Sequence, residues 1–160
     1  MLKDDERALL AALQRDGRLS IQELAERVHM SASTCWRKIR ALEARGVITG
    51  YAALVDPEKV GLMEAVFVHV RLEKHVRTNT DEFMKVVLAR PEVQECYATT
   101  GDEDYVLKVL AADMRAYRRF LEDVLMQMPY IDHIRSNVVL RTIKRDPVIA
   151  PEIIPVSESS

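Results

Sequence analysis

Residues 31–46, SASTCWRKIRALEARG, decide how the N-terminal part of the chain folds. Cys35, Ile39 and Leu42 recur at helical spacing and, at 100° per residue, fall within about 60° of one another, so this apolar stripe faces a core. The opposite side of the predicted helix carries Ser33, Arg37, Arg40 and Ala44. The apolar and the cationic groups therefore occupy different faces of one helix.

The residues before this helix predict a second helix and a tight turn. Ser20 and Glu23 have the spacing of a capping box, in which each side chain bonds to the other residue's backbone N–H. About three residues separate the end of that helix from Ser31, a suitable N-cap for the next one. We expect Gly46 to end the helix as its C′ residue. Two short helices joined by such a turn predict a helix-turn-helix.

Charge on the exposed face indicates a nucleic-acid partner. The formal net charge of −2 argues against one, but residues 33–45 carry four cations and a single anion, Glu43. A local basic patch is enough to dock on phosphates, although a solvated helix face has the same composition. Trp36 could contact a thymine methyl or a sugar, or pack at the domain edge. The candidate DNA-binding residues are Ser31, Ser33, Thr34, Trp36, Arg37, Lys38 and Arg40.

Changes in periodicity, together with the glycine and proline positions, divide the chain into segments. We expect a first helix over residues 4–15, a strand or wing in residues 47–55, and a DNA-binding domain over residues 1–52. Asp56-Pro57 and Gly61 place a linker at about residues 53–62. The Pro- and Ser-rich residues 147–160 suggest a loosely ordered tail.

Residues 63–146 alternate between strand and helix periodicity in the order β-α-β-β-α-β. Strands are predicted within residues 63–73, 93–100, 104–111 and 132–144, and the helices between them begin after the caps Asn79 and Asp113. This is the ferredoxin-like arrangement, so the whole chain is α+β, with a winged helix-turn-helix domain first.

Both helices of such a domain cover one face of the sheet. The other face would carry Phe67, His69 and residues such as Tyr97 or Cys96. Because a bare apolar sheet face is unusual in a soluble monomer, we expect two sheets to pack back to back in a homodimer.

The turn between the second and third strands reads TTGDEDY. Glycine and aspartate are ordinary turn residues, so an acidic hairpin is the favoured interpretation of these residues alone. The residues singled out in this loop are Thr99, Thr100, Gly101, Asp102, Asp104 and Tyr105.

Two stretches resemble one known family. DGRLSIQELAERVHMSASTCWRKIRALEARGVITGYAALVDPEKVGL (16–62) resembles the DNA-binding half of the leucine-responsive regulatory protein/AsnC family, and PEVQECYATTGDEDYVLKV (91–109) resembles its effector domain. The resemblance implies a transcription regulator that senses a free amino acid at the 99–105 loop, so the loop residues named above are candidate effector contacts. An amino-acid ligand would need a carboxylate near its ammonium, from Asp102 or Asp104, and backbone N–H groups near its carboxylate, from around Gly101. The resemblance also implies dimers that assemble further, often to octamers, with effector bound between dimers. The chain departs from the family pattern at Ala32 and Thr34, where prolines are common, and at His29-Met30, where Gly-Leu is common.

The alternatives are an amino-acid-binding regulatory subunit that does not touch DNA, and a small enzyme on a ferredoxin-like scaffold. Cys35 and Cys96 form no zinc or redox spacing, and no nucleophile–base pair or phosphate-binding glycine loop occurs. We therefore expect no enzyme activity and no bound cofactor. We expect a cytoplasmic, nucleoid-associated protein without a membrane partner, because no apolar stretch is long enough for a span.

Overall fold

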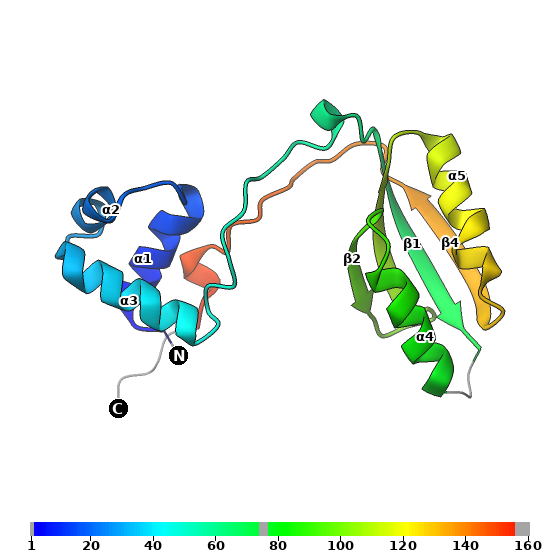
Figure 1. The fold of residues 1–160 in the computed structure, drawn as a ribbon, viewed down its shortest axis with the longest axis horizontal. Coiled ribbons are helices and arrows are strands. Elements are labelled where there is room, and N and C mark those ends of the chain that lie inside the picture. The colour runs from blue at the N-terminus through cyan, green and yellow to red at the C-terminus, as the bar shows by residue number, and fades with distance from the viewer. Residues whose placement is uncertain (1, 74–76, 156–160) are drawn as a thin grey trace. The chain divides into compact units, whose positions relative to one another are not determined.

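The computed structural model describes residues 2–73 and 77–155. The chain forms two compact units, one from the residues up to 53 together with those from 144 onwards, the other from residues 54–143. The first unit is helical, and the second contains the sheet (Figure 1).

The first unit contains α1 (Asp4–Arg15), α2 (Ile21–Arg27) and α3 (Ala32–Ala44), which confirms the predicted helix-turn-helix. Its core is built from one side of each helix, with Leu9, Leu24, Cys35 and Leu42 fully buried. The predicted stripe on α3 therefore packs inward, and burial raises the pKa of the Cys35 thiol, as suits a core residue.

Local caps fix where α2 and α3 begin and end. The Ser20 hydroxyl accepts from the Glu23 N–H at 3.2 Å while the Glu23 carboxylate accepts from the Ser20 N–H at 2.8 Å. Ser31 caps α3 by accepting from the Thr34 N–H at 3.2 Å. Gly46 has a φ of +67°, and the following N–H donates to the Leu42 carbonyl at 2.9 Å. The predicted capping box, N-cap and C′ glycine are all confirmed.

The turn after α2 has the same geometry as the turn at Gly46, but with His29 in the left-handed position, at a φ of +55°. The Met30 N–H donates to the Ala25 carbonyl at 2.9 Å, which closes a Schellman turn. A side chain in this region costs roughly 1–2 kcal/mol relative to glycine.

We predict that His29→Gly raises the free energy of unfolding by about 0.5–1 kcal/mol, because part of the relieved strain is offset by the larger unfolded-state entropy of glycine. Urea unfolding followed by circular dichroism measures the change. Glu26→Gly, at an exposed position inside α2, is the control and should lose about 1 kcal/mol. A histidine variant no more stable than the parent would contradict the strain argument.

The segment predicted as a strand or wing within residues 47–55 does not form a strand. No residue of this segment belongs to a strand, and a short 3-10 helix, η1 (Glu58–Val60), follows it. A loose alternation of apolar residues makes a strand only when another strand supplies the hydrogen-bonded ladder. No such strand lies in the described part of the first unit.

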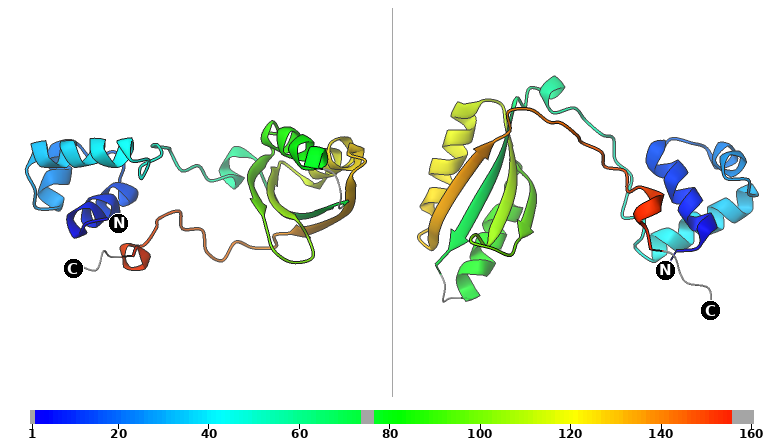
Figure 2. Two further views of the ribbon diagram at one scale, coloured as in Figure 1. Left: turned by 90° about the horizontal axis from the view of Figure 1, so that it is seen from below. Right: turned by 180° about the vertical axis from the view of Figure 1, so that it is seen from behind.

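The second unit is a four-stranded antiparallel sheet in the order β2-β3-β1-β4, with two helices on one face (Figure 2, left). This confirms the ferredoxin-like arrangement. In chain order its elements are β1 (Glu64–Leu72), α4 (Arg77–Leu88), β2 (Val93–Ala98), β3 (Tyr105–Ala111), α5 (Met114–Asp123), η2 (Leu125–Gln127) and β4 (Ile131–Val138).

Two predicted boundaries of this unit are wrong. α4 begins at Arg77, so Asn79 lies inside the helix and is not its N-cap. β4 ends at Val138, whereas the prediction ran to residue 144. Its partner β1 begins at Glu64, and the extra residues have no strand to pair with. By contrast, the predicted cap of α5 is confirmed, because Asp113 accepts from the Ala116 N–H at 2.6 Å.

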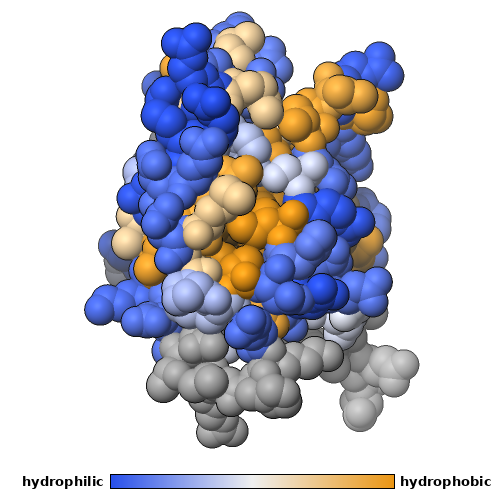
Figure 3. All heavy atoms as spheres, turned by 90° about the vertical axis from the view of Figure 1, so that its right-hand side faces the viewer, coloured by the Kyte–Doolittle hydropathy of each residue, from blue (hydrophilic) through white to orange (hydrophobic). Residues whose placement is uncertain are grey.

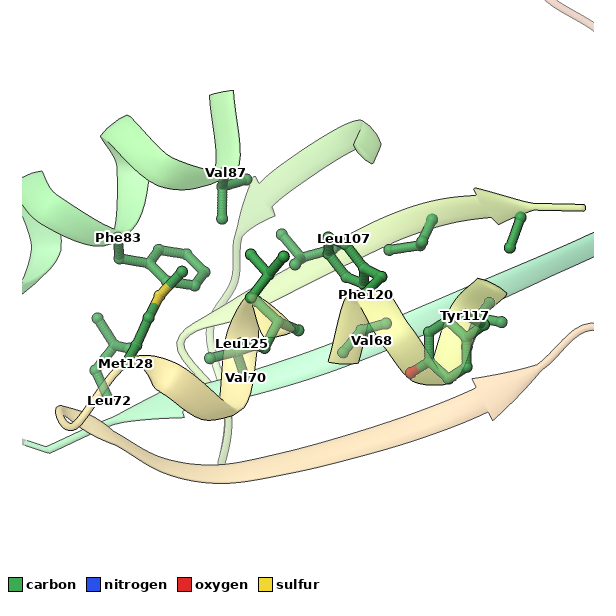
Figure 4. Close-up of a cluster of buried hydrophobic side chains, with 14 of the residues drawn as sticks. Val68, Val70, Leu72, Phe83, Val87, Leu107, Tyr117, Phe120, Leu125 and Met128 are labelled. Atoms are coloured by element: carbon green, nitrogen blue, oxygen red, sulfur yellow. The ribbon is translucent and has the colours of Figure 1, made fainter. Parts of the chain in front are cut away.

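Alternate residues of β1 and β3 point into the core beneath α4 and α5. Val68, Val70 and Leu107 are fully buried there, and they meet Phe83 of α4 and Phe120 of α5 (Figure 4). The rigid sheet fixes the ends of β2 and β3, and so fixes the loop that joins them.

Part of the C-terminal tail is hydrogen-bonded to α1. The Gln14 side chain of α1 donates to the Ile149 carbonyl at 3.1 Å and accepts from the Ile149 N–H at 2.8 Å. The Arg7 guanidinium donates to the Pro151 carbonyl at the start of a short helix, η3 (Pro151–Ile153). The first unit is thus assembled from both ends of the chain.

Candidate DNA-binding helix and effector loop

The exposed face of α3 carries two arginines and an aromatic ring. Arg37 is exposed and has no hydrogen bond or ion pair to any described residue. Trp36 is 54% exposed, and the Arg40 guanidinium lies 5.7 Å from the centre of its ring. An arginine stacked on an aromatic ring keeps its outer edge free to donate hydrogen bonds. This face can therefore meet phosphate oxygens or base edges.

Lys38 has a different role from Arg37 and Arg40. Its ammonium lies 2.7 Å from the Asp5 carboxylate of α1, and its side chain is only 20% exposed. The hydrogen bond from Lys38 lowers the pKa of the Asp5 carboxyl. The structure therefore does not bring Lys38 together with Arg37 on one free surface, and in this state the lysine ties α3 to α1.

Three hydroxyl residues gather at the N-terminus of α3. The Ser31 hydroxyl lies 2.8 Å from the Thr34 hydroxyl and 3.1 Å from the Ser33 hydroxyl. Ser31 is occupied by its capping bond, so Ser33 and Thr34 are the better placed to donate outward. Helix N-termini favour anions because their first N–H groups lack helical partners.

Glu6 stabilises the end of α3, although nothing in the sequence indicated a role for this residue. It is 7% exposed, and its carboxylate accepts from the Arg45 guanidinium at 2.6 Å and from the Lys3 N–H at 2.9 Å. The Lys3 N–H and the Arg45 charge lower the pKa of Glu6, against the opposite effect of burial. Glu6 therefore joins α1 to the residue that ends α3.

The loop between β2 and β3 is a closed hairpin. The Thr99 N–H donates to the Asp104 carbonyl at 3.0 Å, and the Thr99 hydroxyl donates to the Glu103 carbonyl at 3.3 Å. Gly101 has a φ of +123°, a conformation that side chains disfavour. A Cβ added there would meet no atom within 4 Å, so the backbone at the tip is open to an approaching ligand.

The two aspartates of this loop have different surroundings. Asp104 is partly buried, and its carboxylate accepts from the Leu72 N–H at 2.8 Å, where the pairing of β1 with β4 shifts register. Asp102 is exposed and bonds to no other described residue. Thr100 and Gly101 are exposed beside it, whereas Tyr105 packs on Phe83 with ring centres 4.8 Å apart. Only Asp102 therefore has a free carboxylate.

The face of the sheet without helices is partly apolar. Phe67 is 39% exposed and Tyr97 is 53% exposed on this face, with Val106 between their strands. The expected place of Cys96 on this face is wrong, because it pairs with Leu107 and packs against the buried core. The polar members include Lys108, whose ammonium lies 2.6 Å from Glu95.

Apolar residues of this unit are also exposed outside the open sheet face. On the side where α5 and β4 lie, hydrophobic residues gather in the middle of the surface between polar ones (Figure 3). Val138 at the end of β4 is 39% exposed, and Leu140 just beyond it is 98% exposed. The uncovered surface is larger than the open sheet face alone.

Comparison with known proteins places the chain in a family. Residues 65–149 match the model of the Lrp/AsnC ligand binding domain, and residues 6–49 match a winged helix-turn-helix DNA-binding model. The leucine-responsive regulatory proteins of Escherichia coli K12 and Klebsiella pneumoniae are each 37% identical over 140 residues, covering 88% of this chain and 85% of theirs. These matches extend over both units.

Solved structures give the same answer. A transcriptional regulator of Neisseria meningitidis in complex with L-Met has a TM-score of 0.89 at 35% identity, covering 94% of this chain and 97% of that one. An AsnC family regulator of Agrobacterium tumefaciens has a TM-score of 0.90 at 33% identity, covering 96% and 100%.

The chain belongs to the Lrp/AsnC family. It is a transcriptional regulator that joins a DNA-binding helix-turn-helix to a domain for a small ligand. The family consists of transcription regulators, not of enzymes. Among the residues that the structure describes, no helix is long and apolar enough to cross a membrane, and no group of acidic, histidine and cysteine side chains could hold a metal ion.

Proposed function

We propose that the exposed face of α3 reads DNA and that the 99–105 loop binds a free amino acid. The observation that carries the first part is the separation of α3 into a buried stripe and an exposed face with Arg37, Arg40 and Trp36. Arg37 and Arg40 contact base edges or phosphates, and Ser33 and Thr34 contact the backbone near the helix N-terminus. Lys38 contributes less, because Asp5 holds it. DNA as the partner implies a cytoplasmic, nucleoid-associated protein.

The working form of the protein is a homodimer or a multiple of one, such as an octamer. Phe67, Val106 and Tyr97 supply the apolar centre of a sheet-to-sheet interface, and polar residues around them supply its rim. A two-fold axis through this interface relates two copies of α3. Paired helices then engage half-sites about 34–36 Å apart, or at a multiple of that spacing.

The effector is an amino acid because the loop offers the groups such a ligand needs. The free carboxylate of Asp102 receives the ammonium group, and the open backbone at Gly101 receives the carboxylate of the ligand. The relative bound to L-Met supports this class of ligand. A site between dimers couples ligand binding to assembly, and a coupling of about 1–3 kcal/mol is enough for regulation.

We predict that Asp102→Asn weakens amino-acid binding by about 10- to 150-fold, because the bond to a charged group is worth roughly 1.5–3 kcal/mol. Calorimetry with the twenty amino acids, beginning with L-Met and L-Leu, identifies the ligand and gives its affinity. Asp104→Asn also weakens the hydrogen bond from Leu72 at the end of β1, so it should lower both thermal stability and amino-acid affinity. Asp123→Asn removes another exposed carboxylate, on α5, and is the control.

Unchanged affinity in the Asp102 variant would mean that the effector binds elsewhere. Gel shifts with DNA from upstream of the protein's own gene test the other half of the proposal. A protein that binds an amino acid but shifts no DNA would be a regulatory subunit of another kind.

A further inference from the structure

Arg40 is held on two sides by residues of its own helix. Its guanidinium lies 5.7 Å from the Trp36 ring centre, one turn back, and 3.1 Å from the Glu43 carboxylate, one turn ahead. The Arg40 side chain is nevertheless 66% exposed. The guanidinium is therefore oriented without being removed from the surface that faces DNA.

Glu43 is in turn fixed by a residue from outside the helix. One of its carboxylate oxygens accepts from Arg40, and the other accepts from the Tyr51 hydroxyl at 3.1 Å. The Glu43 side chain is 28% exposed. Burial and the hydrogen bond to Glu43 raise the pKa of Tyr51. A tyrosine hydroxyl is a hydrogen-bond donor at neutral pH. Each oxygen has a different partner, so the carboxylate cannot rotate without losing a bond.

The path of the chain after α3 explains why Tyr51 is available for this bond. The left-handed turn at Gly46 reverses the chain, and the next residues run back past Glu43. A Cβ added at Gly17 would lie 4.0 Å from the Tyr51 ring, which places the ring against the loop between α1 and α2. Tyr51, Trp36 and Leu13 are among the residues that line a shallow hollow of about 350 Å³. Tyr51 also lies two residues before Ala53, the last residue of the N-terminal segment of the first unit.

We propose that Glu43 and Tyr51 are positioning residues that orient Arg40 for reading DNA, and so set how well the protein discriminates between sequences. The inference rests on the proposed role of α3. A free arginine side chain loses rotamer entropy when it is fixed against a base. An arginine already held between Trp36 and Glu43 loses less rotamer entropy on binding DNA. This advantage exists only for the orientation in which Trp36 and Glu43 hold it. Discrimination, not general attraction to phosphate, is the property that such positioning improves.

The test uses Tyr51→Phe, because this change removes one hydroxyl and alters no charge. The probes are a duplex selected from a random library with the full-length wild-type protein, and the same duplex with single base-pair changes. Fluorescence anisotropy gives the ratio of affinities for the two. We expect Tyr51→Phe and Glu43→Gln to lower this ratio about three- to tenfold, with the salt dependence of Tyr51→Phe unchanged.

A double-mutant cycle distinguishes positioning from a general structural effect. In an Arg40→Ala background, Tyr51→Phe should have no further effect on discrimination, because its only route to DNA has been removed. Tyr130→Phe is the matched control, since it removes a tyrosine hydroxyl from the core of the other unit, and it should leave the ratio unchanged.

Three results would separate the failures. If Arg40→Ala itself leaves DNA binding unchanged, the proposed role of this part of α3 is wrong. If Arg40→Ala lowers discrimination but Tyr51→Phe does not, the positioning inference alone is overturned. An equal effect of Tyr51→Phe with and without Arg40 overturns it as well.

Discussion

Replacing Phe67 with aspartate will dissociate the protein into monomers at micromolar concentration. Phe67 lies on the central strand β1 of the open sheet face, flanked across the sheet by Lys108 and Asn137. In a two-fold interface the substitution buries two carboxylates at once. An unpaired charge costs several kcal/mol to desolvate, so the dimer dissociation constant should rise at least about 100-fold. Lys108 compensates poorly, because Glu95 already holds its ammonium at 2.6 Å.

Light scattering and sedimentation across a concentration series give the masses for this test. Leu88→Asp is the matched control, since Leu88 is 75% exposed on α4, away from the open face. That control should retain the wild-type mass. A Phe67→Asp protein that is folded and still dimeric would place the interface on another surface, such as the apolar margin beside β4.

Arg37→Ala will lower affinity for a selected duplex by about 5- to 150-fold. Arg37 is exposed on the outer face of α3 with no partner among the described residues, so its guanidinium is free for DNA. An arginine that reads a base edge is worth roughly 1–3 kcal/mol, and its loss relaxes preference at one position of the site. Arg37→Lys should keep a phosphate contact but lose bidentate base recognition, because an ammonium is a point charge.

The salt dependence of binding decides between the two kinds of contact. Loss of a phosphate contact lowers the slope of log affinity against log salt by about one and affects all sequences alike. Arg119→Ala, an exposed arginine on α5, controls for the loss of a positive charge elsewhere. Lys38→Ala should lower thermal stability more than DNA affinity, since it breaks the pair with Asp5. Wild-type affinity and preference in the Arg37 variant would remove α3 from the DNA interface.

The local parts of the fold were predictable because their causes are local. The capping box at Ser20, the N-cap at Ser31 and the turn at Gly46 each depend on residues within about five positions. The buried stripe of α3 and the alternation in β1 follow from one period each. These features carry most of the helix-turn-helix and most of the sheet.

Partners from distant parts of the chain could not be predicted in the same way. No residue near Lys38 in the sequence indicates that Asp5 will pair with it. The sequence also does not distinguish a loop aspartate that binds a ligand from one that, like Asp104, accepts a hydrogen bond at the end of a strand. The bond from Tyr51 to Glu43 depends on a chain reversal whose direction the sequence does not state. The candidate sites were therefore found as segments, and the structure was needed to separate free side chains from occupied ones.

The order of synthesis delays the hydrogen bonds between α1 and the tail. Gln14 and Arg7 are synthesised before residues 54–143, but Ile149 and Pro151 are synthesised after them. The nascent DNA-binding unit therefore lacks these bonds until the whole ligand-binding unit has been made. For the same reason, Ile149→Pro would remove a hydrogen bond to α1, although residue 149 lies far in sequence from the DNA-binding helices.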